Sequence, residues 1–403
     1  MENNKLKLVA EEIGTPFFIY DGDVLKRNIE RLFAAVDNKG LGGRVKIFVA
    51  YFANSNPNIF LKIISEKVGI LLQTKEEYQQ LKKFGINTKM VVSPSFLSDS
   101  DIDFWASKNI PINLASLEEV KYWIEKYDMP VSFRLDLTFG QNQRTGMKKQ
   151  QFTELSKIVK QTGVTPKSIH IYCGTGSSLR KMKGYLRKTI KIWSKYFPEI
   201  KEINLGGGFD FNYKGSTSEE KHFDWSDYFE CLNGLIKKYS ISDDVKFLFE
   251  PGRDILADVG QMVLQVKRVV KFPNNTEVAT DGSYVYLPSA TKRNRKHELL
   301  FLDQNFEKVD EQETFSGKLS GSATLSTDYV LPNLVEIPIG IKENDFIVIQ
   351  DVGAYGATQH MEFLNKKPCP EVFIDNGKIF LITERGADAD KIRYVLENPK
   401  ELL

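Results

Sequence analysis

The sequence is poor in the residues that build disulfide frameworks and metal sites. It contains three cysteines and four histidines in 403 residues. Neither set shows the density of a disulfide scaffold or the spacing of zinc ligands. The 55 basic and 53 acidic residues leave a net charge of +2, which offers no electrostatic reason to expect nucleic acid as a partner. We therefore expect no bound metal and no nucleic-acid ligand.

Long apolar runs are also missing. No window has the roughly 20 apolar residues that a membrane-spanning helix needs, and the polar stretch 1–12 lacks the apolar region of a signal peptide. These features predict a cytoplasmic protein that does not bind membranes. With 41% hydrophobic residues, the chain is long enough to bury one large core and one smaller core, so we expect two domains.

Short apolar runs alternate with helical patterns from about residue 45 to residue 269, which predicts parallel β/α units. Eight such units close into a (β/α)8 TIM barrel. The first expected strand begins at Lys46 and ends before the loop-forming residues Asn54 to Pro57. Beyond residue 260 strands and turns dominate, which predicts a separate β-barrel or β-sandwich domain. We place the barrel at 25–262 and the β domain at 1–24 and 263–403. The other expected barrel strands are 90–92, 112–114, 131–135, 168–172, 202–205 and 247–250.

Three motifs carry residues suited to an anionic ligand. Gly206, Gly207 and Gly208 follow an apolar run, and consecutive glycines let backbone N–H groups approach an anion closely. Glu250-Pro251-Gly252-Arg253 ends the next run, where a carboxylate would point into the ligand mouth of a barrel. Its arginine suits a phosphate or a carboxylate. The run 351–356, with Tyr355, lies in the expected β domain.

These motifs and the run Ala53-Asn54-Ser55-Asn56-Pro57 resemble the fold-type III pyridoxal-phosphate (PLP) decarboxylases, which include diaminopimelate, ornithine, arginine and carboxynorspermidine decarboxylases. In that family the segment reads Tyr-Ala-Val-Lys-Ala-Asn-Ser-Asn-Pro, and its lysine holds PLP as a Schiff base. Aligned on the shared residues, the lysine position is Phe52. The resemblance implies an alanine-racemase-like barrel followed by a β domain, and a homodimer with shared active sites.

The resemblance also implies roles for the cofactor motifs. The three glycines would form the phosphate loop, Glu250 with Gly252 and Arg253 would face the pyridine nitrogen, and Tyr355 would bind the phosphate. Tyr172 stands where the family has a ring-stacking histidine, and Thr175 replaces a serine. Arg144 lies in a segment similar to the family's Arg-Phe-Gly loop. His170, two residues before Tyr172, is expected to be a core histidine.

Other positions depart from the family at reacting or substrate-facing sites. The run 321–328 aligns with a Gly-Pro-x-Cys-acid-x-x-Asp signature, in which Thr324 takes the cysteine position and Leu325 the acid position, while Asp328 is kept. The family uses that acid to hold the distal amino group of its substrate. Leu325 therefore argues against ornithine, lysine or diaminopimelate as the substrate. No residue is assigned as catalytic.

Several functions remain open. The first is an active-site-modified homologue that binds PLP, a PLP–amino acid adduct or another phosphorylated small molecule non-covalently, as a binder or as an enzyme with altered chemistry in specialised biosynthesis. The second is a true decarboxylase that uses a lysine from elsewhere, such as Lys181, Lys183 or Lys292. The third is a non-catalytic subunit that regulates an active decarboxylase, which the loss of the donated cysteine at Thr324 weakens.

Overall fold

The computed structural model describes residues 2–65, 68–137, 145–164, 166–293 and 295–386. The chain forms two compact units. The barrel unit is Leu25–Leu256, and the β unit combines Met1–Val24 with Ala257–Leu403. Arg144 lies outside the described residues, so its predicted place in a ligand site has no structural counterpart.

Eight parallel strands form the barrel unit, in the order β4-β3-β2-β9-β8-β7-β6-β5. A parallel bridge between Val92 and Ile112 joins the two outer strands, which confirms the expected TIM barrel. One strand, β3, was not among the strands expected from the sequence. The strands are β2 (Val45–Ala50), β3 (Gly69–Leu72), β4 (Met90–Val92), β5 (Asn113–Leu114), β6 (Val131–Leu135), β7 (Pro166–Ile171), β8 (Glu202–Asn204) and β9 (Lys246–Phe249).

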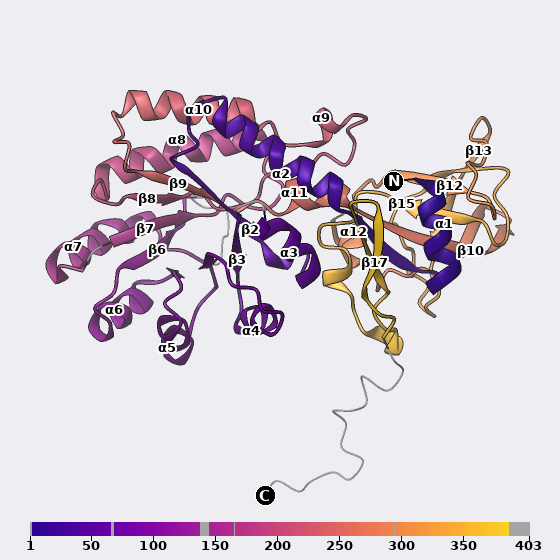
Figure 1. Cartoon of the computed structure of the whole chain (residues 1–403), viewed down its shortest axis with the longest axis horizontal. Helices are drawn as coiled ribbons and strands as arrows, with labels where there is room; N and C mark the ends of the chain where they lie inside the picture. Colours follow the sequence, from indigo (N-terminus) through magenta and orange to yellow (C-terminus); the bar gives the residue numbers. More distant parts are fainter. Residues whose placement is uncertain (1, 66–67, 138–144, 165, 294, 387–403) are drawn as a thin grey trace, which may run out of the picture. The chain divides into compact units, whose positions relative to one another are not determined.

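Helices separate the strands along the chain and surround them in space (Figure 1). In α8, Met182, Leu186, Ile190 and Trp193 are buried at intervals of three or four residues, as an amphipathic helix requires. The helices are α2 (Gly22–Asp37), α3 (Pro57–Ser65), α4 (Lys75–Lys83), α5 (Asp99–Ser107), α6 (Leu117–Lys126), α7 (Phe152–Thr162), α8 (Leu179–Tyr196), α9 (Ser218–Lys221), α10 (Trp225–Lys238) and α11 (Arg253–Leu256).

The β unit is built on a mixed sheet in the order β14-β13-β11-β10-β1-β16-β17, with β15 pairing both β10 and β12. Its core includes Phe17 and Ile19 of β1, Val263 of β10 and Val348 of β15. This sheet confirms the separate β domain. Its elements are α1 (Asn3–Ile13), β1 (Phe17–Asp21), β10 (Gly260–Phe272), β11 (Asn275–Thr280), α12 (Pro288–Arg293), β12 (Leu299–Leu302), β13 (Thr314–Ser320), β14 (Val335–Pro338), β15 (Phe346–Ile349), β16 (Glu371–Asp375) and β17 (Lys378–Thr383).

Among the helices of the described residues, none combines the length and the apolar character that a membrane span requires.

Candidate functional site

Glu250 stands directly after β9, at the carboxyl-terminal end of the barrel strands, and its side chain is buried. Three residues from other strands or strand ends donate hydrogen bonds to its carboxylate. The Asn204 amide lies 2.8 Å from Oε1, the Ser93 hydroxyl lies 3.3 Å from Oε1, and the His170 Nε2 lies 3.1 Å from Oε2. Because parallel strands end at one mouth of a barrel, residues far apart in sequence meet around one carboxylate.

The protonation states of this cluster follow from burial and hydrogen bonding. Burial raises the pKa of Glu250, but the hydrogen bonds from His170 and Asn204 and the charge of Arg134 lower it by more, so its pKa lies below the usual value. Burial lowers the pKa of His170 more than Glu250 raises it. Near neutral pH the carboxylate is ionised and the neutral imidazole donates through Nε2. Within the described part of the chain, the buried His170 Nδ1 has no hydrogen-bond partner.

Arg134, in β6, is a site residue that the sequence analysis missed. It is buried, and burial lowers its pKa while the charges of Glu250 and Asp136 raise it. Its guanidinium lies 5.5 Å from the centre of the Tyr172 ring, a cation–π distance. The Tyr172 hydroxyl in turn lies 2.7 Å from Thr175 Oγ1. An arginine inside an apolar strand run was a visible signal, because a buried charge needs a partner.

The glycine loop has a structural reason for its composition. Gly206 and Gly208 have φ angles of 64° and 95°, in the left-handed region that favours glycine. A Cβ atom at Gly206, Gly207 or Gly208 would collide with the carbonyl oxygen of a neighbouring segment, namely Ile171, Glu250 and Gly174 respectively. The loop is therefore packed tightly among strand ends, whatever it binds.

The N–H groups of the loop are not all used by the protein. The Gly206 N–H donates to Asn204 Oδ1 at 2.9 Å. The N–H groups of Gly207 and Gly208 have no acceptor among the residues that the structure describes. Two adjacent N–H groups in such a turn suit an anion.

The segment after Glu250 is held by its own contacts. The Arg253 guanidinium donates to the Tyr213 hydroxyl at 2.9 Å, and the Gly252 carbonyl accepts the Leu256 N–H at 3.1 Å. The Ala50 N–H donates to the Pro251 carbonyl at 3.0 Å, so the end of β2 lies beside this segment. Phe52 is half-buried and lies in the 3-10 turn η1 (Tyr51–Ala53) rather than on the strand itself.

The remaining predicted residues belong to the β unit. Asp328 is buried, and its carboxylate accepts hydrogen bonds from the Ser283 hydroxyl at 2.9 Å and the Tyr284 N–H at 2.8 Å. These bonds join the loop 321–328 to the distant segment at Ser283 and Tyr284, so the geometry favours a structural role. Thr324 and Leu325 are exposed, and Tyr355 is half-buried with a φ of 60°.

Comparison with known proteins places the chain in a family. Residues 26–257, more than half of the chain, match the family described as "Pyridoxal-dependent decarboxylase, pyridoxal binding domain". The chain therefore belongs to the pyridoxal-dependent decarboxylases. It is 23% identical over 416 residues to diaminopimelate decarboxylase of Methanothermobacter thermautotrophicus, covering 96% of this chain and 92% of the relative. It is 23% identical over 418 residues to the Archaeoglobus fulgidus protein of the same name, covering 97% and 95%.

Solved structures have the same fold. Diaminopimelate decarboxylase from M. jannaschii in complex with L-lysine matches with a TM-score of 0.85 at 20% identity, covering 98% of this chain and 95% of that one. Diaminopimelate decarboxylase from Helicobacter pylori complexed with L-lysine matches with a TM-score of 0.82 at 21% identity, covering 96% of this chain and 98% of that one. Lysine/ornithine decarboxylase from Vibrio vulnificus complexed with cadaverine matches with a TM-score of 0.78 at 17% identity, covering 93% of this chain and 98% of that one.

Proposed function

We propose that the chain is an active-site-modified pyridoxal-dependent decarboxylase homologue that binds PLP, or a PLP–amino acid adduct, without a covalent lysine link. The observation that carries the proposal is the ionised, buried carboxylate of Glu250 at the mouth that also contains the glycine loop. A carboxylate of this kind is a strong partner for a protonated ring nitrogen. Another phosphorylated small molecule would use the same loop.

The residues of the barrel unit fit the cofactor. The free N–H groups of Gly207 and Gly208 would receive its phosphate, Glu250 would hold its ring nitrogen protonated, and Tyr172 would present an aromatic face to its ring. When bound, PLP supplies an electron-withdrawing ring that stabilises negative charge on an attached amino acid. Arg134, beside Tyr172 and near Glu250, would bind a carboxylate of the ligand. The predicted contact of Tyr355 with the phosphate belongs to the same proposal.

Phe52 sets the limit of this chemistry. Family members use a lysine amine both to hold the cofactor and to exchange it with the substrate, and a phenyl ring has no nucleophile for either step. The chain would therefore retain its ligand only by packing, hydrogen bonds and charge. Leu325 in place of the acid predicts that the bound amino acid lacks a distal amino group.

A PLP titration of the dialysed full-length protein tests the proposal. Visible absorbance would follow binding, and borohydride reduction followed by intact-mass measurement would detect any covalent link. We expect saturable binding with no increase in mass after reduction. Failure to bind PLP or a reduced PLP–amino acid adduct would contradict the cofactor assignment and direct the search to other phosphorylated ligands.

A true decarboxylase with a lysine from elsewhere is the second candidate, and specific contacts bear on it. Lys183 forms an ion pair with Asp227 between the outer helices α8 and α10. Lys148 forms one with the buried Asp136, just after β6 at the carboxyl-terminal mouth. Lys148 would have to leave this ion pair before it could react. A mass increase located at Lys148, and lost in Lys148→Met, would establish this candidate instead.

The shared-site homodimer implied by the resemblance remains a prediction. Light scattering of the purified full-length chain measures its mass in solution, and mixing two inactive or non-binding variants would show whether sites are completed across subunits.

A further inference from the structure

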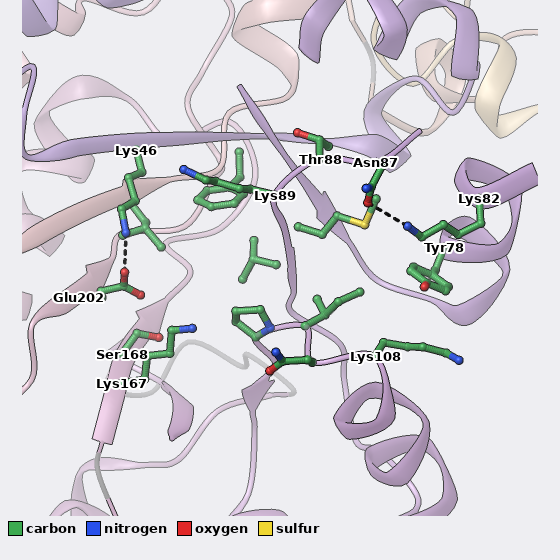
Figure 2. A pocket seen from close by; sticks show the side chains of 17 residues that line it. Lys46, Tyr78, Lys82, Asn87, Thr88, Lys89, Lys108, Lys167, Ser168 and Glu202 are labelled. Carbon is green, nitrogen blue, oxygen red and sulfur yellow. Dashed lines mark hydrogen bonds and ion pairs between the residues drawn. The ribbon is translucent and has the colours of Figure 1, made fainter. Parts of the chain in front are cut away.

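A pocket lies at the opposite end of the barrel, where the strands begin. Its volume is about 420 Å³, within the range of small-molecule sites. Five lysines from separate elements line it together with one carboxylate (Figure 2): Lys46, Lys82, Lys89, Lys108, Lys167 and Glu202. This face of a TIM barrel normally serves stability rather than binding. A concentration of one sign of charge around a concave space is therefore an unexpected feature of it.

Three of these lysines have local roles. Lys46 forms an ion pair with Glu202 at 2.6 Å. Lys82, in the last turn of α4, donates to Asn87 Oδ1 at 3.1 Å. Lys108 follows the last residue of α5 and lies 5.3 Å from the centre of the Phe104 ring. Lysines at helix carboxyl termini offset the partial negative charge of the helix dipole. These three ammonium groups are thus largely accounted for by the protein.

Lys89 and Lys167 are different. Lys89 directly precedes β4 and Lys167 is the second residue of β7. Within the described residues, neither ammonium group makes a hydrogen bond or an ion pair with a side chain. Figure 2 shows Lys89 extending toward the side of the pocket that holds Lys46, with Lys167 beside Ser168 below. Two unpaired ammonium groups at one pocket match the charge of a dianion.

Part of the wall between the lysines is apolar. Phe48, Met90, Pro111 and Leu248 contribute to the lining, and the buried Ser168 adds a hydroxyl group. A bare inorganic anion would leave this apolar surface uncovered. A ligand with a flat or apolar body and a doubly charged group would use both parts of the pocket.

We propose that this amino-terminal pocket binds a small organic phosphate monoester, with Lys89 and Lys167 contacting the phosphate and the apolar wall covering the body of the ligand. The site is separate from the glycine loop and Glu250. Lys89 precedes β4 and Lys167 lies at the start of β7, whereas Glu250 follows the end of β9 and the glycine loop follows β8. The inference does not depend on PLP binding at the other end.

Calorimetric titration of the full-length protein with AMP tests the proposal. AMP carries a phosphate monoester and a flat body, and it has no aldehyde that would react with lysines. We expect saturable binding that Lys89→Glu/Lys167→Glu weakens by roughly tenfold or more, since two favourable charge contacts become repulsive. The matched control is Lys191→Glu/Lys237→Glu, which makes the same charge change at exposed positions of α8 and α10. Thermal unfolding of both variants checks that each of them folds.

Three results would overturn the proposal. The first is no AMP binding at millimolar concentration. The second is an equal loss of affinity in the control variant, which would show a general charge effect. The third is inorganic phosphate binding as tightly as AMP, which would show that the apolar wall contributes nothing. Lysine acetylation followed by peptide mass spectrometry locates the site independently: AMP should protect Lys89 and Lys167, and unchanged acetylation at both would contradict the assignment.

Discussion

The two mouths of the barrel differ in the sign of their charged residues and in the burial of these residues. At the carboxyl-terminal mouth a single buried carboxylate, Glu250, is surrounded by donors from Ser93, His170 and Asn204. At the amino-terminal mouth five lysines surround an open pocket, and the one acidic residue that lines it, Glu202, is paired with Lys46. The first mouth holds a buried, hydrogen-bonded carboxylate, and the second is lined by exposed or half-exposed lysines.

This difference shows how burial decides what a charge does. A buried charge costs several kcal/mol unless hydrogen bonds satisfy it, so the surroundings of Glu250 are necessarily specific in position and chemistry. A half-exposed lysine carries little such cost, and its amine stays available to an incoming anion. The carboxyl-terminal mouth is therefore suited to orienting a ligand, and the amino-terminal mouth is suited to attracting one.

The largest expected change comes from moving a lysine to the mouth that lacks one. Phe52→Lys places an amine two residues beyond Ala50, whose N–H bonds the Pro251 carbonyl beside Glu250. We expect PLP to become covalently attached after borohydride reduction, whereas the native protein remains unmodified. Peptide mass spectrometry should locate the label at position 52. If the native protein were instead labelled at the lysines that line the amino-terminal mouth of the barrel, the accessibility of lysines alone would explain why PLP attaches.

Removing the carboxylate from each mouth should lower the free energy of unfolding by different amounts. Glu250→Ala leaves the buried partners Asn204 and His170 without an acceptor, so we expect a loss of about 3 kcal/mol in the free energy of unfolding. Glu202→Ala, at a half-exposed ion pair, should cost only about 0.5 kcal/mol. Urea unfolding of both variants measures the difference. Equal losses would show that the Glu250 cluster contributes no special stability.

The pH dependence of stability tests the neutral state of His170. Its folded pKa lies below the usual value because burial disfavours the charged ring. The unfolded chain therefore takes up this proton at about pH 6.5, which is a higher pH than the folded protein requires. Stability from this group is present above pH 6.5 and is lost as the pH falls, by at most about 1.4 kcal/mol per pH unit.

His170→Gln supplies the comparison for that slope. Glutamine keeps a donor for Glu250 but does not titrate, so the variant should lose less stability than the native protein between pH 7.5 and pH 5.5. Urea unfolding at the two pH values measures the difference, in which contributions from groups that do not interact with His170 cancel. Identical slopes would mean that His170 does not change its protonation on folding.

The smallest expected effect is the response of the amino-terminal mouth to salt. The ion pair of Lys46 with Glu202 is partly exposed, so screening by salt should weaken it. The stability difference between native protein and Glu202→Gln should shrink by a few tenths of a kcal/mol between low and high salt. The difference between native protein and Glu250→Gln should change less, because the buried cluster is shielded from ions. A reversed order would contradict the burial argument.

The sequence by itself determined the order of the fold. Alternating apolar runs and helical patterns predicted the barrel, and the later run of strands and turns predicted the β domain. A buried strand requires a short apolar run and a covering helix requires one apolar face, so both patterns are visible in the sequence. The positions of the glycine loop and Glu250 at strand ends were also visible, since Gly, Asn and Pro mark where strands stop. The family resemblance named roles for these residues but could not supply their contacts.

Only the tertiary structure decided which residues surround those motifs. Ser93 and Arg134 were not singled out in the sequence, yet they share the environment of Glu250 with His170, which sequence reasoning had placed in the core. Asp328 ties its loop to the distant Ser283 and Tyr284, which no spacing indicated. The lysines of the amino-terminal pocket come from positions 46 to 167 and have no common motif. The physical reason is the same in each case: parallel strands bring distant residues to one mouth, and that convergence depends on strand order and register rather than on any local pattern.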